Sequence, residues 1–230
     1  MSSAPRSTRP PLFPGQRLKQ AEFHRRYEAY PKDVKFELIG GVVHMPSPLR
    51  RTHGSYHLEL NGIFWHYKRA TPGVEALDNT TTILGEASEP QPDLDLRILE
   101  GYGGQSQVTE DDYVAGPPEL MAEVAHSSRD IDLGQKRSDY EQAGVLEYLV
   151  LCVVEQQLRW FHFPSGRELK PNRQGIWKSQ VFPGLWIDGR ALLACDSNRL
   201  LEVVQQGLAS PGHVRFVKRL QAAHRRRSQG

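Results

Sequence analysis

Residues 118–144, PELMAEVAHSSRDIDLGQKRSDYEQAG, decide the fold of this chain. The first half alternates as a β-strand does, with Leu120, Ala122 and Val124 on one face. Glu123 lies on the other face, inside an otherwise apolar run. An isolated buried charge costs several kcal/mol, so this carboxylate needs a partner, a proton or a metal ion. The strand is therefore predicted to carry a functional acid.

The second half of the stretch predicts a helix of about three turns. Serine and aspartate residues within 127–132 can cap its N-terminus, and Gly144 can end it. One stripe of this helix consists of Leu133, Lys136, Tyr140 and Ala143. Lys136 thus faces the core and forms, with Glu123, a candidate catalytic pair. A surface salt bridge between Asp132 and Lys136 is the alternative, because the two are four positions apart.

The composition is that of one globular domain, since 38% of the 230 residues are hydrophobic and 24% are charged. No apolar run approaches the roughly 20 residues that span a bilayer, and the N-terminus lacks the apolar core of a signal peptide. We therefore expect a cytoplasmic protein with no membrane partner. Cys152 and Cys195 form no CxxC pattern, which argues against a zinc site and a disulfide framework. A net charge of +2 does not by itself indicate a nucleic-acid partner.

The pattern of elements divides the chain into three segments. Residues 1–15 are rich in Pro, Ser and Arg and are expected to form a disordered arm, whereas 16–195 form the folded core. Residues 196–230 predict a helical extension with a basic tail, which either contacts nucleic acid or is simply solvated. The elements expected in the core are helices at 18–30 and 53–67, a hairpin at 36–45, and strands at 74–84, 92–98, 147–154 and 158–163.

A second candidate acid lies in the strand PDLDLRI, residues 92–98. Its charged residues, Asp93, Asp95 and Arg97, share one face, which is either a site or, as the pattern alone favours, a solvent-facing edge. Adjacent strands lie about 4.8 Å apart, so Asp93 and Glu123 can hold one divalent cation if they project from the same face. Oxygen ligands without thiolates favour Mg²⁺ or Mn²⁺ over zinc. A nearby lysine can stabilise the negative charge that develops in phosphodiester hydrolysis.

Glu37, His53 and His57 are weaker candidates. Glu37 alternates with apolar neighbours in the expected hairpin and faces either solvent or a site. His53 and His57 are four positions apart on one helix face, close enough to share a metal ion. Because the glutamate and third ligand of a zincin motif are missing, the pattern favours a histidine that lines a cleft and contacts substrate, with His53 as the candidate.

The chain resembles a known family at several of these positions. The matching segments are Phe36–Val43, Pro46–His53, Pro92–Asp93, Glu123–Ala125, Asp132 with Lys136 and Tyr140, and Gly144–Val150. Together they look like the restriction endonuclease family known as the Uma-two group, within the PD-(D/E)XK nuclease superfamily, over roughly residues 18–193. The resemblance implies an α/β, restriction-endonuclease-like core in which helices flank a central mixed β-sheet. It also implies that Asp93 and Glu123 are metal ligands and that Glu37 is a further acidic site residue.

One position departs from the superfamily pattern. The superfamily lysine normally stands two positions after the glutamate, where this chain has Ala125. In the resembling family its role is thought to move to the following helix, which implies that Lys136 replaces it. The inward stripe of that helix indicates the same residue independently.

The function expected from these residues is a Mg²⁺-dependent or Mn²⁺-dependent endonuclease that hydrolyses phosphodiester bonds, with DNA as its nucleic-acid partner. Asp93 and Glu123 would bind the metal, Lys136 and Glu37 would act in catalysis, and His53 would contact substrate. Residues 16–195 would be the nuclease-like domain, and a homodimer is possible because related nucleases often act as dimers. The alternatives are a nucleic-acid-binding protein on the same fold that does not cleave, and a protein-interaction module.

Overall fold

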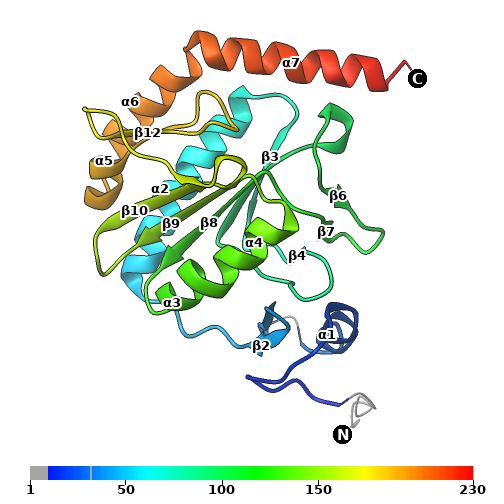
Figure 1. Ribbon diagram of the computed structural model, residues 1–230. Helices are drawn as coiled ribbons and strands as arrows, with labels where there is room; N and C mark the ends of the chain where they lie inside the picture. The colour runs from blue at the N-terminus through cyan, green and yellow to red at the C-terminus, as the bar shows by residue number, and fades with distance from the viewer. Residues whose placement is uncertain (1–9, 32, 230) are drawn as a thin grey trace, which may run out of the picture.

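The computed structural model describes residues 10–31 and 33–229, and a six-stranded sheet forms its centre (Figure 1). The strand order is β11-β10-β9-β8-β5-β3. These strands are β3 (Val74–Asp78), β5 (Leu94–Ile98), β8 (Leu120–Ala125), β9 (Glu147–Cys152), β10 (Gln157–His162) and β11 (Arg167–Glu168). β8 and β9 run parallel, whereas the other neighbours are antiparallel. The predicted α/β fold with a central mixed sheet between helices is confirmed.

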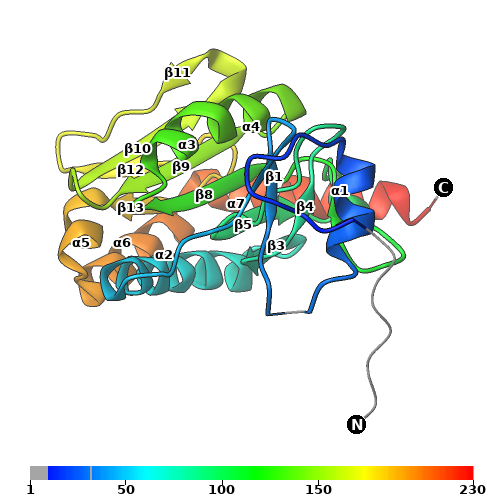
Figure 2. The ribbon, with the colours of Figure 1, turned by 90° about the horizontal axis from the view of Figure 1, so that it is seen from below.

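A layer of helices covers one face of the sheet (Figure 2). These helices are α2 (Arg51–Ala70), α5 (Gly189–Ala194), α6 (Ser197–Leu208) and α7 (Pro211–Arg227). Leu120, Ala122 and Val124 of β8 point into this layer, as their alternation predicts. Leu60 and Phe64 of α2 are fully buried against them, so the main hydrophobic core lies on this side of the sheet.

The opposite face of the sheet carries the helical segment that follows β8. This segment consists of α3 (Arg129–Ile131), a π-helical turn η2 (Asp132–Lys136) and α4 (Arg137–Ala143). A second core forms here, in which Tyr140 of α4 packs with Tyr148 of β9. α4 ends at Gly144, whose φ of 97° lies in the left-handed region that glycine adopts without steric cost.

The N-terminal elements are α1 (Gln20–Tyr27), β1 (Glu37–Ile39) and β2 (Val42–His44). They enclose a small core around Phe23, Phe36 and Leu38. Of the arm expected over residues 1–15, the first nine lie outside the described residues. Leu12 is buried in this small core, and its N–H donates to the Tyr30 hydroxyl at 2.7 Å.

Short strands complete the structure. β4 (Thr82–Ile83), β7 (Val114–Ala115) and β6 (Gln107–Val108) form a three-stranded sheet, and β12 (Ile176–Lys178) pairs with β13 (Trp186–Asp188). Single 3₁₀ turns, η1 (Glu100–Tyr102) and η3 (Phe163–Ser165), lie in the connections. The strand expected over 74–84 is thus divided into β3 and β4. Within residues 10–31 and 33–229, no helix is long and apolar enough to cross a membrane.

Candidate active site

Asp93 and Glu123 lie on neighbouring strands and on the same face of the sheet. β5 and β8 are antiparallel with Leu94 opposite Ala122, so Asp93, one residue before β5, comes beside Glu123. Their apolar neighbours pack on the α2 side; the Glu123 carboxylate faces Lys136 of η2 and Tyr140 of α4, whereas the Asp93 carboxylate meets His53 at the N-terminal end of α2. Both side chains are buried, and Asp93 Oδ2 accepts a hydrogen bond from the Val124 N–H at 2.7 Å. The charge of Asp93 acts on the Glu123 carboxyl, so the two acids belong to one cluster.

Lys136 reaches these acids from η2. A π-helical turn is wider than an α-helical turn and occurs often at functional sites. Lys136 Nζ lies 3.0 Å from Glu123 Oε1 and 3.0 Å from Glu37 Oε1. Its distance to Asp132 Oδ1 is 3.7 Å. Lys136 and Asp132 are both buried, so their contact is not the exposed salt bridge that the sequence left open.

Glu37 enters the site from β1. The hairpin of β1 and β2 is held against the body of the protein by a bridge between Leu38 and Glu89. Glu37 is buried, and its Oε1 accepts a hydrogen bond from the Gln91 N–H at 2.8 Å. The sequence allowed Glu37 to face either solvent or a site, and in the structure its side chain faces the acidic cluster. Lys136 therefore contacts both Glu37 and Glu123, although the three residues come from separate segments of the chain.

The site carries an excess of negative charge. Carboxylates of Glu37, Glu123 and Asp132 lie on the Lys136 ammonium, and the charge of Asp93 acts on Glu123. Burial raises the pKa of Glu123, and it raises the pKa of Asp132 to about 6 although the ammonium and Ser128 oppose the rise. Burial disfavours the Lys136 ammonium, but the carboxylates, that of Glu123 most of all, outweigh this and raise the Lys136 pKa. Such a cluster of acids favours either shared protons or a bound cation.

His53 presents a nitrogen to Asp93. Its Nδ1 lies 2.9 Å from the Val124 carbonyl oxygen, which can only accept, so Nδ1 must carry the proton that is donated there. Nε2 then lies 3.3 Å from Asp93 Oδ1 and makes no hydrogen bond within the described residues. Metal-binding histidines are typically fixed in this way through their other nitrogen.

His57 adds a third ligand atom to this group. Its Nε2 lies 3.1 Å from Asp78 Oδ1 and 3.1 Å from the Asp93 carbonyl oxygen. One ligand atom each from His53, His57 and Asp93 lie within 4.8 Å of one another. The donor set fits a divalent cation, because His53 Nε2 and Asp132 Oδ1 are buried in this acidic cluster and make no hydrogen bond within the described residues. The sequence pattern disfavoured a metal role for these histidines because it could not supply the third ligand.

Comparison with protein families matches residues 21–192 to the family Uma2, described as "Putative restriction endonuclease". The chain belongs to the Uma2 family. A crystal structure from Anabaena variabilis, described as a "putative nuclease belonging to DUF820", has a similar fold, with a TM-score of 0.58. The two chains are 14% identical, and the match covers 77% of this chain and 98% of that one. No curated protein matches the sequence. The family resemblance predicted from the motifs is confirmed.

In this Uma2 chain, the lysine position of the superfamily pattern is occupied by Ala125, which is fully buried in the core beneath α4. A lysine there would need room among apolar side chains. Lys136 instead brings its ammonium to Glu123 Oε1 from the adjacent helical layer.

Residues that sequence reasoning did not assign to the site hold its acids in place. The Tyr140 hydroxyl donates to Glu123 Oε1 at 3.0 Å. The Ser128 hydroxyl donates to Asp132 Oδ2 at 2.6 Å, and the Tyr148 hydroxyl donates to the Asp132 carbonyl oxygen at 3.2 Å. Tyr140 lies on the same inward stripe as Lys136, and this periodicity is the sequence feature that could have assigned Tyr140 to the site.

Asp95 and Arg97 are buried, so the preference for a solvent-facing edge is wrong. The three-stranded sheet of β4, β7 and β6 lies over this face. Thr82 of β4 donates to Asp95 Oδ2 at 3.3 Å, and Ser106, just before β6, accepts from the Arg97 guanidinium at 3.0 Å through its hydroxyl. The Arg97 guanidinium also forms an ion pair with Glu75 of β3 at 3.0 Å, so its buried charge is balanced within the fold.

Proposed function

We propose that this Uma2 protein is a divalent-metal-dependent endonuclease that hydrolyses phosphodiester bonds in DNA. The observation that carries the proposal is the convergence of Asp93, Glu123 and Lys136 in one buried cluster rich in acids. Membership of the family supports nuclease activity, and the excess of carboxylates supports a hard cation such as Mg²⁺ or Mn²⁺. His53 joins Asp93 as a candidate ligand, in addition to the substrate contact expected from the sequence.

The residues have distinct tasks in this mechanism. Asp93 and Glu123 would hold the cation, with His53 as a third ligand. When bound, the cation supplies a Lewis acid for the phosphate and lowers the pKa of water. Lys136 stabilises the negative charge that develops on the phosphoryl oxygens. Glu37 helps to hold the Lys136 ammonium in place, with its Oε1 3.0 Å from Lys136 Nζ. Tyr140 fixes the orientation of the Glu123 carboxylate.

Basic side chains next to the site support a nucleic-acid substrate. Arg50 and Arg51 lie at the N-terminal end of α2, within one turn of His53, and both are exposed. Phosphates of a bound strand are attracted to such exposed arginines, so binding is expected to weaken strongly with salt. A phosphate brought there lies near the acids and the candidate cation.

The direct test is incubation of the purified protein with supercoiled plasmid in Mg²⁺, in Mn²⁺ and in excess chelator. We expect nicking or linearisation with metal and none with chelator. Asp93→Ala, Glu123→Ala and Lys136→Ala should each reduce the rate by about a hundredfold or more, because each removes a ligand or a charge that acts in the transition state. A labelled RNA of matched length distinguishes a DNA substrate from an RNA substrate.

Asp111→Ala is the matched control, because it removes an exposed carboxylate outside the cluster. Its rate should equal that of the unaltered protein. Cleavage that persists in the combined Asp93→Ala, Glu123→Ala and Lys136→Ala variant would contradict the proposal. Circular dichroism of each variant separates loss of activity from loss of fold.

The second candidate is a nucleic-acid-binding protein that does not cleave, and α7 is the feature that favours it. This helix carries His224, Arg225, Arg226 and Arg227 in its last turn and no acidic residue in its first. DNA binding that weakens steeply with salt, without cleavage in any metal, would favour this candidate. A homodimer and a cytoplasmic location stay predictions from the sequence.

A further inference from the structure

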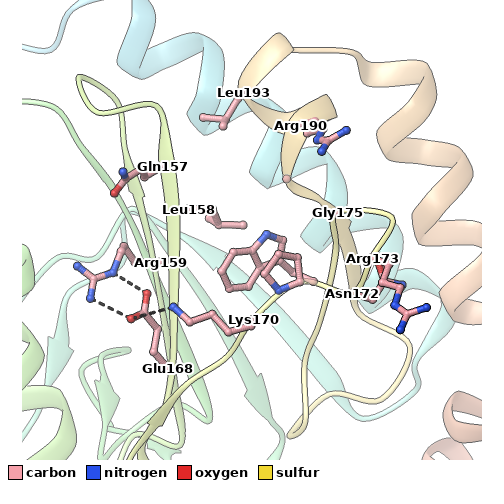
Figure 3. A pocket seen from close by; sticks show the side chains of 13 residues that line it. Gln157, Leu158, Arg159, Glu168, Lys170, Asn172, Arg173, Gly175, Arg190 and Leu193 are labelled. Carbon is pink, nitrogen blue, oxygen red and sulfur yellow. Dashed lines mark hydrogen bonds and ion pairs between the residues drawn. The ribbon is translucent and has the colours of Figure 1, made fainter.

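A cavity of about 610 Å³ lies beside β10, outside the acidic cluster (Figure 3). Its lining comes from the start of β10, the strand β11, the segment that leads to β12, and the start of α5. No residue of the acidic cluster lines it. The size of this cavity falls within the range of small-molecule sites in proteins, roughly 300–1,000 Å³.

The walls of the cavity are basic. Arg159, Glu168 and Lys170 lie on one side, and Arg173 and Arg190 lie on the other (Figure 3). Glu168 pairs with Arg159 at 2.6 Å and with Lys170 at 3.4 Å, so one carboxylate is shared by two cations. Within the described residues, the Arg173 and Arg190 side chains have no ion pair. The lining therefore carries uncompensated positive charge, which favours an anionic ligand.

Apolar groups form the inner part of the same cavity. Leu158 and Trp177 are 7% exposed, and Leu193 contributes from α5. The Trp177 indole N–H makes no hydrogen bond within residues 10–31 and 33–229, and it is not among the fully buried polar atoms that lack a partner, so it stays accessible to a ligand or to water. A Cβ on Gly189 would lie 2.7 Å from Trp177 Nε1, so glycine at this position leaves room for the indole. A flat ring with polar edges suits this surface.

The wall beyond β11 is held in a fixed shape. Asn172 Oδ1 accepts hydrogen bonds from the N–H groups of Gln174 and Ile176, at 2.9 and 3.0 Å. The Gly189 N–H donates to the Gly175 carbonyl oxygen at 3.1 Å, which ties this loop to the start of α5. The Arg190 side chain lies along Gly175, since a Cβ there would come within 3.8 Å of Arg190 Nε. The cavity thus has an ordered frame and long cationic side chains at its rim.

We propose that this cavity binds a nucleoside monophosphate unit, with the base against Trp177 and the phosphate at Arg173 and Arg190. Arginine offers planar, bidentate contacts to phosphate, and base stacking on aromatic rings is tolerant of sequence. The unit comes either from a nucleic-acid strand or from a free nucleotide. Binding of a nucleic-acid strand rests on the proposed nuclease function, whereas binding of a free nucleotide does not.

The sheet places the cavity at the same end as the acidic cluster. Ala125, two residues after Glu123, pairs with Cys152 of β9, and Cys152 pairs with Gln157 at the start of β10. Two strand spacings, about 10 Å, therefore separate the backbone of Gln157 from that of Ala125. Leu158 and Trp177 of the cavity pack in the core on the α2 side, whereas Glu123 faces Lys136 on the other side, so a strand bound at the acids would pass around the end of the sheet to reach the cavity.

Binding in chelator tests the inference without cleavage. A fluorescently labelled single-stranded dodecathymidylate is titrated by anisotropy, and thymidine 5′-monophosphate is titrated by calorimetry. For the probe that occupies the cavity, the double variant Arg173→Ala/Arg190→Ala should weaken binding about tenfold or more. For the strand, the slope of log affinity against log salt should fall by about 0.7 for each phosphate that the variant no longer binds. Tryptophan emission should be quenched by the probe, and Trp177→Phe should remove most of that quench.

Arg17→Ala/Arg69→Ala is the matched control, since both arginines are exposed and neither lines the cavity. A selective loss of mononucleotide binding in the cavity variant identifies a free nucleotide as the occupant, and a loss confined to the dodecathymidylate identifies a strand. Equal losses in the cavity and control variants, or no binding of either probe, would overturn the inference. Plasmid cleavage is measured separately, so failure of the nuclease proposal and failure of this one are distinguishable.

Discussion

Lys136 Nζ lies 3.0 Å from Glu123 Oε1, with both side chains 6% exposed. Glu37 and Asp132 lie on the same ammonium, at 3.0 and 3.7 Å. The lysine is thus the counter-ion of a buried acidic cluster as well as a candidate catalytic group. Its removal leaves several carboxylates without a partner in a dry environment.

Lys136→Met is therefore expected to destabilise the fold by about 3–5 kcal/mol, as the loss of one partner from a buried ion pair generally does. Mg²⁺ should restore part of this loss, because a cation can replace the missing positive charge. Urea denaturation with and without Mg²⁺ measures both effects. Lys218→Met is the control, since Lys218 is exposed on α7 and its loss should change stability little. A fully stable Lys136→Met variant would contradict the assigned counter-ion role.

His53→Ala should weaken metal binding by about tenfold or more, because even outer-shell changes have effects of this size. The loss should be larger for Mn²⁺ than for Mg²⁺, since imidazole suits transition metals better than Mg²⁺. Isothermal titration of the protein without DNA gives both affinities. His66→Ala on the same helix is the matched control and should leave them unchanged. Equal metal affinities for the His53→Ala and unaltered proteins would show that His53 is not a metal ligand.

Glu123 and Lys136 could be predicted from local patterns, whereas for Asp93 the pattern alone favoured a solvent-facing edge and the family resemblance indicated the site. Asp93 and Glu123 are polar residues within alternating strands, and sequential strands usually pair. Lys136 follows from helical periodicity, and the family resemblance indicated the same residues. These features depend on neighbours a few positions away along the chain.

The rest depends on contacts between distant segments. His57 meets Asp93 only because the N-terminal half of α2 packs against the start of β5, 36 positions further along the chain. Asp95 is buried because Thr82 of β4 lies over it, and β4 is held there by pairing with β7 from the long 100–118 stretch. The alternation of polar and apolar residues in strand 92–98 is the same whether its polar face is covered by a second small sheet or open to water.

Two glycines in helices should respond oppositely to alanine. Gly62 lies in the exposed interior of α2, and a Cβ there would meet nothing within 4 Å. Gly62→Ala should stabilise the protein by about 0.5–1 kcal/mol, because alanine loses less backbone entropy on folding. A Cβ on Gly207 of α6 would lie 2.2 Å from the Gly184 carbonyl oxygen.

Gly207→Ala should therefore force α6 away from β13 and destabilise the protein by about 1–3 kcal/mol, as overpacking does. Thermal unfolding of the two variants under identical conditions measures the difference. The same sign of change for both would show that helix propensity, rather than contact at Gly184, decides the result at position 207.

The pH dependence of stability should change in Glu89→Gln. Glu89 is fully buried and joins α1 to the body, with its carboxylate 2.7 Å from Gln20 Nε2 and 2.8 Å from His24 Nδ1. Burial raises its pKa above the usual 4.5, although His24 and Gln20 oppose the rise. Folding thus favours the protonated acid. The stability that this group contributes is complete below pH 4.5 and is lost as pH rises through the raised pKa.

Glutamine is neutral at every pH, so Glu89→Gln should remove this loss. Its amide can be accommodated, because Gln20 can flip its amide and His24 can change tautomer. The variant should match the unaltered protein near pH 4 and exceed it in melting temperature by a margin that grows toward pH 8. Glu86→Gln is the control, because Glu86 is exposed nearby and should show no such trend. A margin that shrinks as pH rises would mean that the ionised carboxylate, through its pair with His24, stabilises the attachment of α1.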